Sequence, residues 1–204
     1  MYKIIGIAGL AGDGKDSVCN ILESFFKKNS GFTFRRVALA DELKLDSKHA
    51  IIDILGIDPT NCPREDKEKI RPFLVFYGKL MRLKTKGQYW TNILDKKFSA
   101  YYSNKNIFCV PDVRYVEYPD DEVQWVKKNS GVLIHVKKYT MTESLFPQKV
   151  YTTPVNKEEL QNDPKIQQVA DYLIEWQDSK TSPENDLNCI LAVESIAKKI
   201  LKTI

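Results

Sequence analysis

The sequence predicts one α/β domain over residues 1–204, with three layers and a mainly parallel sheet of about five strands. Two observations lead to this prediction. Residues 2–8 form an almost unbroken apolar run that ends at Gly9, which is typical of a strand buried on both faces. After that run, amphipathic stretches and short apolar runs alternate along the chain, as helices and strands do around a parallel sheet.

The remaining elements follow from hydrophobic spacing and from helix-capping residues. After Gly14, apolar residues recur at i, i+3, i+4, i+7 and i+8, so a helix is expected to lie on the sheet and to end near residues 29–31. Asp41 is expected to cap a second helix that ends near Leu55. Further helices are expected around 71–83, 90–102, 120–129 and 193–204, and further strands at 33–39, 107–110 (central in the sheet), 132–136 and, more weakly, 187–191.

Composition limits the possible classes of function. The formal charge of +4 over 204 residues is too balanced for binding nucleic acid or a membrane surface through bulk charge. No apolar run approaches the roughly 20 residues of a membrane-spanning helix, and the glycine loop begins too early for a signal peptide, so we expect a cytoplasmic protein. A disulfide framework or a Cys/His zinc site is not expected, because the cysteines are scattered and only two histidines are present. The expected reduced thiols are Cys19, Cys62, Cys109 and Cys189.

A phosphate-binding loop, or P-loop, is expected between the first strand and the first helix. Residues 9–15 match the GxxxxGK pattern and lie where such a loop must lie, at the start of a helix. Backbone N–H groups and the helix N-terminus would wrap the phosphates of ATP, and Lys15 would bridge the β- and γ-phosphates. An ordinary glycine-rich turn is the alternative, although such a turn has no need of Lys15. The predicted ATP-binding residues are Gly9, Ala11, Gly12, Asp13, Gly14, Lys15, Asp16 and Ser17.

The residue after Lys15 departs from the usual P-loop, which has Ser or Thr there to hold Mg²⁺. Here Asp16 takes that position and Ser17 follows it. Asp112, just beyond the strand at 107–110, is expected beside the loop, because ligands bind at the carboxyl ends of parallel strands. We therefore expect Mg²⁺ to be held by Asp16, Ser17 or Asp112, directly or through water. The alternative role for Asp112 is that of a turn or capping residue.

Residues 64–86 form a basic segment, with eight Lys or Arg residues against three acids and a local net charge of +5. On one unbroken helix, Arg71 and Arg82 would lie within about 20° of each other and about 16 Å apart, so they would hold different groups, or one would be solvated. Both arginines are expected to face solvent or a cleft, because the apolar residues centre on the opposite face. Those apolar residues are Phe73, Phe76, Leu80 and Leu83.

Three other residues are candidates for binding a phosphorylated ligand. Lys44 follows the second strand and would reach a phosphate, or it is a solvated surface lysine. Arg114 would clamp phosphoryl oxygens, or form a salt bridge with Glu117 or Asp120. Trp90 would stack on a base, although interior packing is commoner for an aromatic residue in such a helix.

The region 138–186 is more polar and contains four prolines, and 155–190 holds eight acids against three lysines. This composition predicts an excursion over the sheet that acts as a lid. Residues 56–105 would form a helical region that binds the phosphate acceptor. His135 lies within an apolar strand and is expected to be a core residue.

Most of residues 1–137 resembles the phage deoxynucleoside monophosphate kinases and, more distantly, the animal-type phosphomevalonate kinases. The matching segments, in the same order, are GKDS at 14–17, ADELK at 40–44, the helix from Arg71 to Arg82 followed by Tyr-Trp at 89–90, VPDVR at 110–114 and the strand after Gly131. The resemblance implies a P-loop kinase fold with a helical acceptor-binding insert and a lid. A GTPase is disfavoured, because residues 156–159 read NKEE rather than NKxD.

The activity implied by the resemblance is transfer of the γ-phosphoryl group of ATP, with Mg²⁺, to a (deoxy)nucleoside monophosphate for DNA synthesis. The expected catalytic residues are Lys15, Asp16, Asp112 and Arg114, and the expected acceptor-binding residues are Lys44, Arg71, Arg82, Trp90 and Arg114. No membrane or nucleic-acid partner is expected, a homodimer is left open, and the compartment would be the host cytoplasm for a phage-encoded chain. The alternatives are another phosphate-acceptor kinase, such as phosphomevalonate kinase, or a non-catalytic module that binds nucleotides or nucleic acid.

Overall fold

The computed structural model describes residues 3–101, 105–178 and 182–203. Five parallel strands form a sheet in the order β2-β3-β1-β4-β6, and a short strand, β5, pairs antiparallel with the far part of β4. The strands are β1 (Lys3–Ala8), β2 (Thr33–Arg36), β3 (Asn106–Val110), β4 (Val132–Met141), β5 (Lys149–Tyr151) and β6 (Tyr172–Gln177). The predicted α/β class, the mainly parallel sheet and the interior position of the strand at 107–110 are confirmed.

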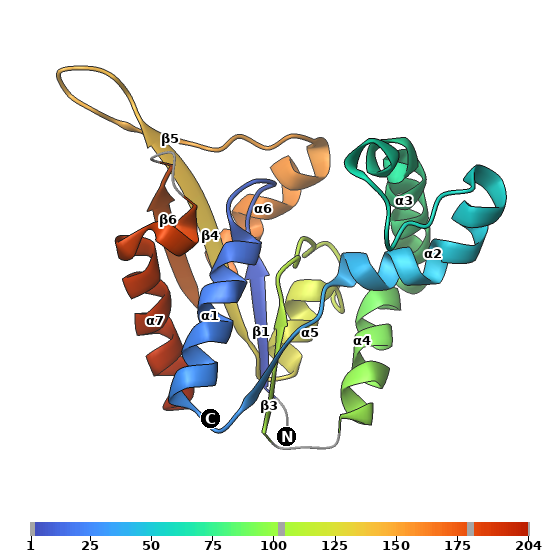
Figure 1. The fold of residues 1–204 in the computed structure, drawn as a ribbon, viewed down its shortest axis with the longest axis horizontal. Coiled ribbons are helices and arrows are strands. Elements are labelled where there is room, and N and C mark those ends of the chain that lie inside the picture. Colours follow the sequence, from blue (N-terminus) through green and yellow to red (C-terminus); the bar gives the residue numbers. More distant parts are fainter. Residues whose placement is uncertain (1–2, 102–104, 179–181, 204) are drawn as a thin grey trace.

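Helices cover both faces of the sheet and produce three layers (Figure 1). They are α1 (Lys15–Asn29), α2 (Leu39–Leu55), α3 (Arg64–Thr85), α4 (Tyr89–Ala100), α5 (Glu122–Lys128), α6 (Lys157–Val169) and α7 (Leu187–Leu201), with a short 3₁₀ turn at Pro183–Asn185. The apolar stripe of α1 packs with α7 against one face, while α4 and α5 pack against the other. α2 and α3 project beyond the sheet, next to the carboxyl ends of its strands (Figure 1).

The predicted strand at 187–191 is wrong, because these residues begin α7. The side chain of Asp186 accepts a hydrogen bond from the backbone N–H of Cys189 at 3.0 Å and caps this helix. The fifth parallel strand is instead β6, inside the region predicted as a polar excursion. β6 lies at an edge of the sheet and alternates buried with more exposed residues. Because polar residues interrupt its apolar ones, the segment did not read as an apolar run in the sequence.

The buried and exposed residues of α3 differ from those predicted. Arg82 is only 6% exposed, whereas Phe76 and Leu83 are 63% and 67% exposed. The side of α3 that meets the rest of the protein faces carboxylates of the segment 114–122, so a buried cation is matched there better than an apolar residue. The expectation that these apolar residues pack against the protein is therefore wrong for Phe76 and Leu83. Arg82 is not solvated, but it does border a cleft, which was the other expected position.

The structure also bears on several smaller expectations. Within the described residues, no helix is long and apolar enough to cross a membrane. The thiols there are free, and three of the four are buried. His135 is a core residue, as expected, and its Nε2 lies 2.9 Å from Oδ1 of Asp163. Three predicted element ends lie outside the described residues, namely Tyr2, Tyr102 and Ile204.

Candidate active site

Glycines with positive φ angles shape the loop between β1 and α1, where phosphate binding is expected. Gly9 has a φ of 138° and Gly14 a φ of 85°, both in the region that favours glycine. A Cβ atom at Gly9 would lie 2.4 Å from the carbonyl oxygen of Val136, so a larger residue does not fit. Asp13 is buried inside the loop, where its carboxylate accepts the N–H of Leu10 at 3.0 Å. Asp13 therefore supports the shape of the loop.

Lys15 is folded back over this loop. Its Nζ donates to the carbonyl oxygens of Gly9 at 2.9 Å and Leu10 at 2.7 Å. Burial lowers the pKa of Lys15, and the positive charge of Arg114 lowers it further. The ammonium group is thus held by two carbonyl oxygens at the place where a phosphate oxygen would compete for it.

Asp112 joins the end of β3 to the start of α2. Its Oδ1 accepts the N–H of Leu39 at 2.9 Å, and its Oδ2 accepts the N–H of Ala40 at 2.7 Å. The predicted cap, Asp41, lies in the first turn of α2 and does not cap it, so that prediction is wrong. Burial raises the pKa of Asp112, while the two backbone hydrogen bonds oppose that shift. Asp112 is therefore a capping residue supplied by another element.

A cavity of about 310 Å³ opens beside Asp112, among α2, α3, α4 and the segment 112–122. Its charged lining is mostly cationic and consists of Lys44, Lys67, Arg71, Lys79, Arg82 and Arg114, with Asp112 and Glu122 as the acids. Apolar side chains complete the wall, among them Leu39, Leu43, Ile70, Leu74 and Trp90. Such a lining matches a ligand with an anionic end and an apolar or aromatic body.

All the residues predicted to bind the acceptor line this one cavity, although their surroundings differ. Lys44 pairs with Asp41 at 3.2 Å, and Arg71 pairs with Glu68 at 2.7 Å. Arg114 makes no side-chain hydrogen bond or ion pair within the described residues. The salt bridge considered as its alternative is therefore not found there, and its guanidinium group can meet a ligand.

Trp90 is packed into the protein. Its ring makes edge contacts with Tyr77 and Tyr89, with centroids 6.1 Å and 4.7 Å apart. Its Nε1 donates to the carbonyl oxygen of Gly78 at 3.4 Å. Interior packing, the commoner fate, is what the structure shows, and Trp90 contributes only part of its surface to the cavity wall.

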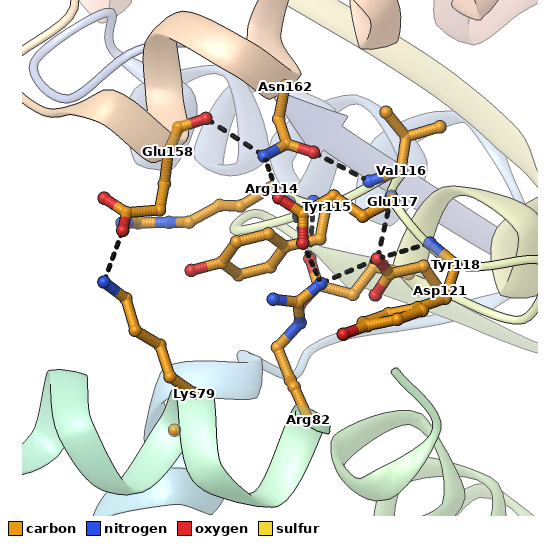
Figure 2. Close-up of polar contacts among 12 residues, drawn as sticks. Lys79, Arg82, Arg114, Tyr115, Val116, Glu117, Tyr118, Asp121, Glu158 and Asn162 are labelled. Atoms are coloured by element: carbon orange, nitrogen blue, oxygen red, sulfur yellow. Dashed lines mark hydrogen bonds and ion pairs between the residues drawn. The ribbon is translucent and has the colours of Figure 1, made fainter. Parts of the chain in front are cut away.

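Arg82 is held between carboxylates and an aromatic ring (Figure 2). Its Nη2 donates to Oδ2 of Asp121 at 2.7 Å and to Oε2 of Glu117 at 3.2 Å. Its guanidinium carbon lies 3.4 Å from the centroid of the Tyr115 ring. Asp121 also accepts the backbone N–H of Tyr118 at 3.3 Å. These contacts of Arg82 hold α3 against the segment 115–121.

Two residues that sequence reasoning missed, Tyr115 and Glu122, also line the cavity. Oε2 of Glu122 accepts the N–H of Arg114 at 2.6 Å and the N–H of Tyr115 at 3.2 Å, so Glu122 fixes the backbone that carries Arg114. Burial raises the pKa of Glu122 to about 8, although the hydrogen bond from Arg114 opposes the shift. Its place in the first turn of the helix expected at 120–129, soon after Arg114, was the signal that could have identified it.

The first turn of α6 reaches both sides of the site. Glu158 pairs with Lys79 of α3, and this contact lowers the pKa of Glu158. Oε1 of Glu159 accepts the N–H of Ala11, in the P-loop, at 3.3 Å. α6 therefore lies between the P-loop and α3, as Figure 1 also shows.

The residues expected to hold Mg²⁺ include two carboxylates, those of Asp16 and Asp112. Within the described residues, no group of three or more His, Cys, Asp or Glu side chains is arranged to hold a metal ion. Asp16 is exposed, and both of its contacts with Arg36 end on the same oxygen, Oδ1. Mg²⁺ bound with substrate phosphates needs only one or two protein carboxylates, so Asp16 fits such an ion. Ser17 follows it in the first turn of α1.

No protein-family model and no curated protein matches this sequence. Among solved structures, the protein TT1252 from Thermus thermophilus is 15% identical, over 100% of this chain and 98% of that one, with a TM-score of 0.50. Dephospho-CoA kinase from Campylobacter jejuni is 16% identical over 98% of this chain and 100% of that one, with a TM-score of 0.47. Shikimate kinase from Acinetobacter baumannii, in complex with shikimate, is 14% identical over 100% and 93% of the two chains, with a TM-score of 0.42. At such identities a likeness concerns the fold alone.

Proposed function

We propose that this protein is a kinase that transfers the γ-phosphoryl group of ATP to a nucleoside monophosphate, with a deoxynucleoside monophosphate as the preferred acceptor. One observation carries the proposal: a cationic cavity adjoins a P-loop. Arg114 lines the cavity and lies close enough to Lys15 to lower the pKa of Lys15. Asp112 lines the same cavity and also acts on the charge of Lys15. A donor phosphate on the loop and an acceptor phosphate in the cavity would therefore meet around Arg114.

The walls of the cavity support a nucleotide as the acceptor. Lys44, Arg71 and Arg114 provide positive charge for one phosphate group, and the apolar wall provides contact for a base and sugar. The preference for a deoxynucleotide rests on the resemblance of the segments at 14–17, 40–44 and 110–114 to the phage enzymes.

The roles of the side chains follow from this arrangement. The backbone N–H groups of the loop and Lys15 hold the transferred phosphate, and Arg114 neutralises charge between donor and acceptor. The acceptor is already a phosphate oxyanion, so no strong general base is needed. Asp16, Ser17 or Asp112 would hold Mg²⁺, directly or through water, and the bound ion would neutralise further phosphate charge. α3 and α4 form the acceptor side of the domain, and α6 acts as part of the lid.

Replacement of Lys15 tests the proposal. Lys15→Met is expected to lower kcat by about 10²–10³-fold or more, because it removes a positioned charge from the transferred phosphate. Release of ADP is measured with ATP and a panel of deoxy- and ribonucleoside monophosphates. Lys27→Met, on the exposed side of the same helix, is the matched control and is expected to keep wild-type turnover.

Three outcomes would contradict the proposal. Unchanged turnover in a folded Lys15→Met protein would remove the P-loop from the mechanism. Turnover of phosphomevalonate but of no nucleotide would assign a different acceptor. Steeply salt-dependent binding of nucleic acid without turnover of any acceptor would instead indicate a binding module.

A further inference from the structure

The side chain of Lys79 is placed for ligand binding but has no assigned role. It lies on α3, one turn before Arg82, and lines both the 310 Å³ cavity and a neighbouring cavity of about 380 Å³ between α3 and α6. Its ammonium group points toward the carboxylate of Glu158 (Figure 2). Within the described residues, Glu158 is its ion-pair partner.

The two cations of this part of α3 are held very differently. Arg82 is buried, and its partners Asp121 and Glu117 belong to the segment that follows β3. Lys79 is half exposed, and its partner belongs to α6. A phosphate can compete with one exposed carboxylate much more easily than with a buried pair, because exposed ion pairs contribute little free energy.

α6 carries its two neighbouring carboxylates in different directions. Consecutive helical residues are 100° apart, so Glu158 and Glu159 reach different partners from one turn. Glu158 meets a cation of the acceptor cavity, and Glu159 meets an N–H group of the P-loop. Farther along the helix, Asn162 accepts the N–H of Val116 at 3.2 Å and donates to Glu117 at 3.0 Å, which keeps α6 near both sites.

We propose that Lys79 is a further acceptor-phosphate ligand and that Glu158 occupies it until an acceptor binds. This inference rests on the proposed function and names a residue in the same cavity. In the last turns of α3, Lys79 binds the acceptor phosphate, whereas Arg82 stays paired with Asp121 and Glu117. An incoming phosphate replaces the carboxylate of Glu158 as the partner of Lys79.

A double-mutant cycle tests this proposal. Binding of the four common deoxynucleoside monophosphates is measured without ATP, with the matching nucleosides as phosphate-free controls. Lys79→Gln is expected to weaken the best-bound monophosphate by about tenfold or more, because a charge-assisted contact is lost. Glu158→Gln is expected to tighten it by about twofold to fivefold, because an exposed ion pair contributes little free energy. In the Lys79→Gln background the second substitution is expected to change nothing, and nucleoside binding stays constant throughout.

Controls separate this proposal from its alternatives. Glu159→Gln removes the same charge one residue away and is expected to leave monophosphate binding unchanged. The Lys79 assignment is overturned if Lys79→Gln binds as the wild type does, or if Glu158→Gln still tightens binding without Lys79. In both cases the proposed function survives if turnover still depends on Lys15. Absence of binding for every monophosphate would overturn both the assignment and the proposed function.

The contact of Glu159 leads independently to a second proposal. Glu159 places a carboxylate oxygen on the N–H of Ala11, one of the amides expected to bind a phosphate, while its Oε2 accepts the N–H of Val155 at 3.1 Å. The loop amide therefore already has an anionic partner within the chain. We propose that Glu159 competes with ATP for this amide, so that ATP must displace α6 from the loop.

The test compares carboxylates of different reach. Glu159→Gln and Glu159→Asp are each expected to tighten ATP binding by about threefold to fivefold, measured without acceptor. The Asp variant keeps the charge but is one methylene too short for the contact, so a mere charge effect would leave it unchanged. Glu158→Gln is the control and is expected to leave ATP binding unchanged. Equal tightening by Glu158→Gln, or none by Glu159→Asp, would overturn the competition. If the wild-type protein does not bind ATP, the proposed function is overturned as well.

Discussion

The loop at 9–15 and the cavity beside it, which are the proposed donor and acceptor sides, are built in different ways. The loop consists of consecutive residues whose shape is set by their own backbone and glycines, with Lys15 as its charged side chain. The cavity beside it takes side chains from α2, α3, α4 and the segment 112–122. A site made of consecutive backbone is visible as a motif, whereas a site made of distant side chains depends on how the helices pack.

Arg71 and Arg82 show this difference most clearly, because the sequence placed them on one face of one helix. In the structure Arg71 is exposed beside Glu68, and Arg82 is buried beside Asp121 and Glu117. Arg82→Ala is expected to lower the free energy of unfolding by about 3–5 kcal/mol, because it leaves buried Asp121 without its cation. Arg71→Ala is expected to leave that free energy unchanged. Urea denaturation measures both.

Equal stability of the two variants would contradict the buried network. Arg82→Lys provides a second measurement, because it keeps the charge while losing the planar group over Tyr115. Its stability is expected to lie between those of the wild type and Arg82→Ala.

The sequence predicted most of the fold, since its strongest signals are local. The buried strand β1, the glycine loop after it and the apolar stripe of α1 occur within 27 residues, and each lies at its expected place in the chain. Two of the errors, at Asp41 and on the face of α3 that carries Arg82, arose where partners distant in sequence decide the outcome. Asp112 caps α2 from outside that helix, and Glu117 and Asp121 form ion pairs with the buried Arg82. Nothing in the spacing within α3 could identify those partners.

Replacing Asp112 tests the link between β3 and α2. In Asp112→Asn one oxygen is exchanged for an NH₂ group, which cannot accept the N–H of Leu39 or Ala40. We expect a loss of about 1–2 kcal/mol in the free energy of unfolding, the usual cost of a lost helix cap. Asp41→Asn is the matched control within α2 and is expected to have no effect. Equal losses in the two variants would return the capping role to Asp41.

Glu122 predicts a dependence of stability on pH. Its ordinary pKa is 4.5, and burial raises it to about 8 in the folded protein. Between these values the folded chain keeps a proton that the unfolded chain releases. The contribution of the protonated group to stability is therefore complete below pH 4.5 and is lost as the pH rises toward 8.

Glu122→Gln removes this titration while keeping an oxygen that can accept the N–H of Arg114. From pH 5 to pH 8, the Tm of the wild type is expected to fall relative to that of Glu122→Gln, and the difference is expected to level off above pH 8. Glu143→Gln, at an exposed position, serves as the control and should follow the wild-type profile. Parallel Tm profiles for wild type and Glu122→Gln would show that Glu122 is ionised in the folded protein throughout.

The smallest effect is expected on the outer face of α3. Leu83 is largely exposed there, although its spacing predicted a core position, so Leu83→Ala is expected to change the free energy of unfolding by less than about 0.5 kcal/mol. Ile70 lies on the same helix with its side chain buried, and Ile70→Ala is expected to cost about 2–5 kcal/mol, because it leaves a hole in the packing. Urea denaturation of the two variants compares the two faces of α3 within one helix. A loss at Leu83 as large as that at Ile70 would mean that the outer face is covered in solution, in conflict with its exposure in the monomer.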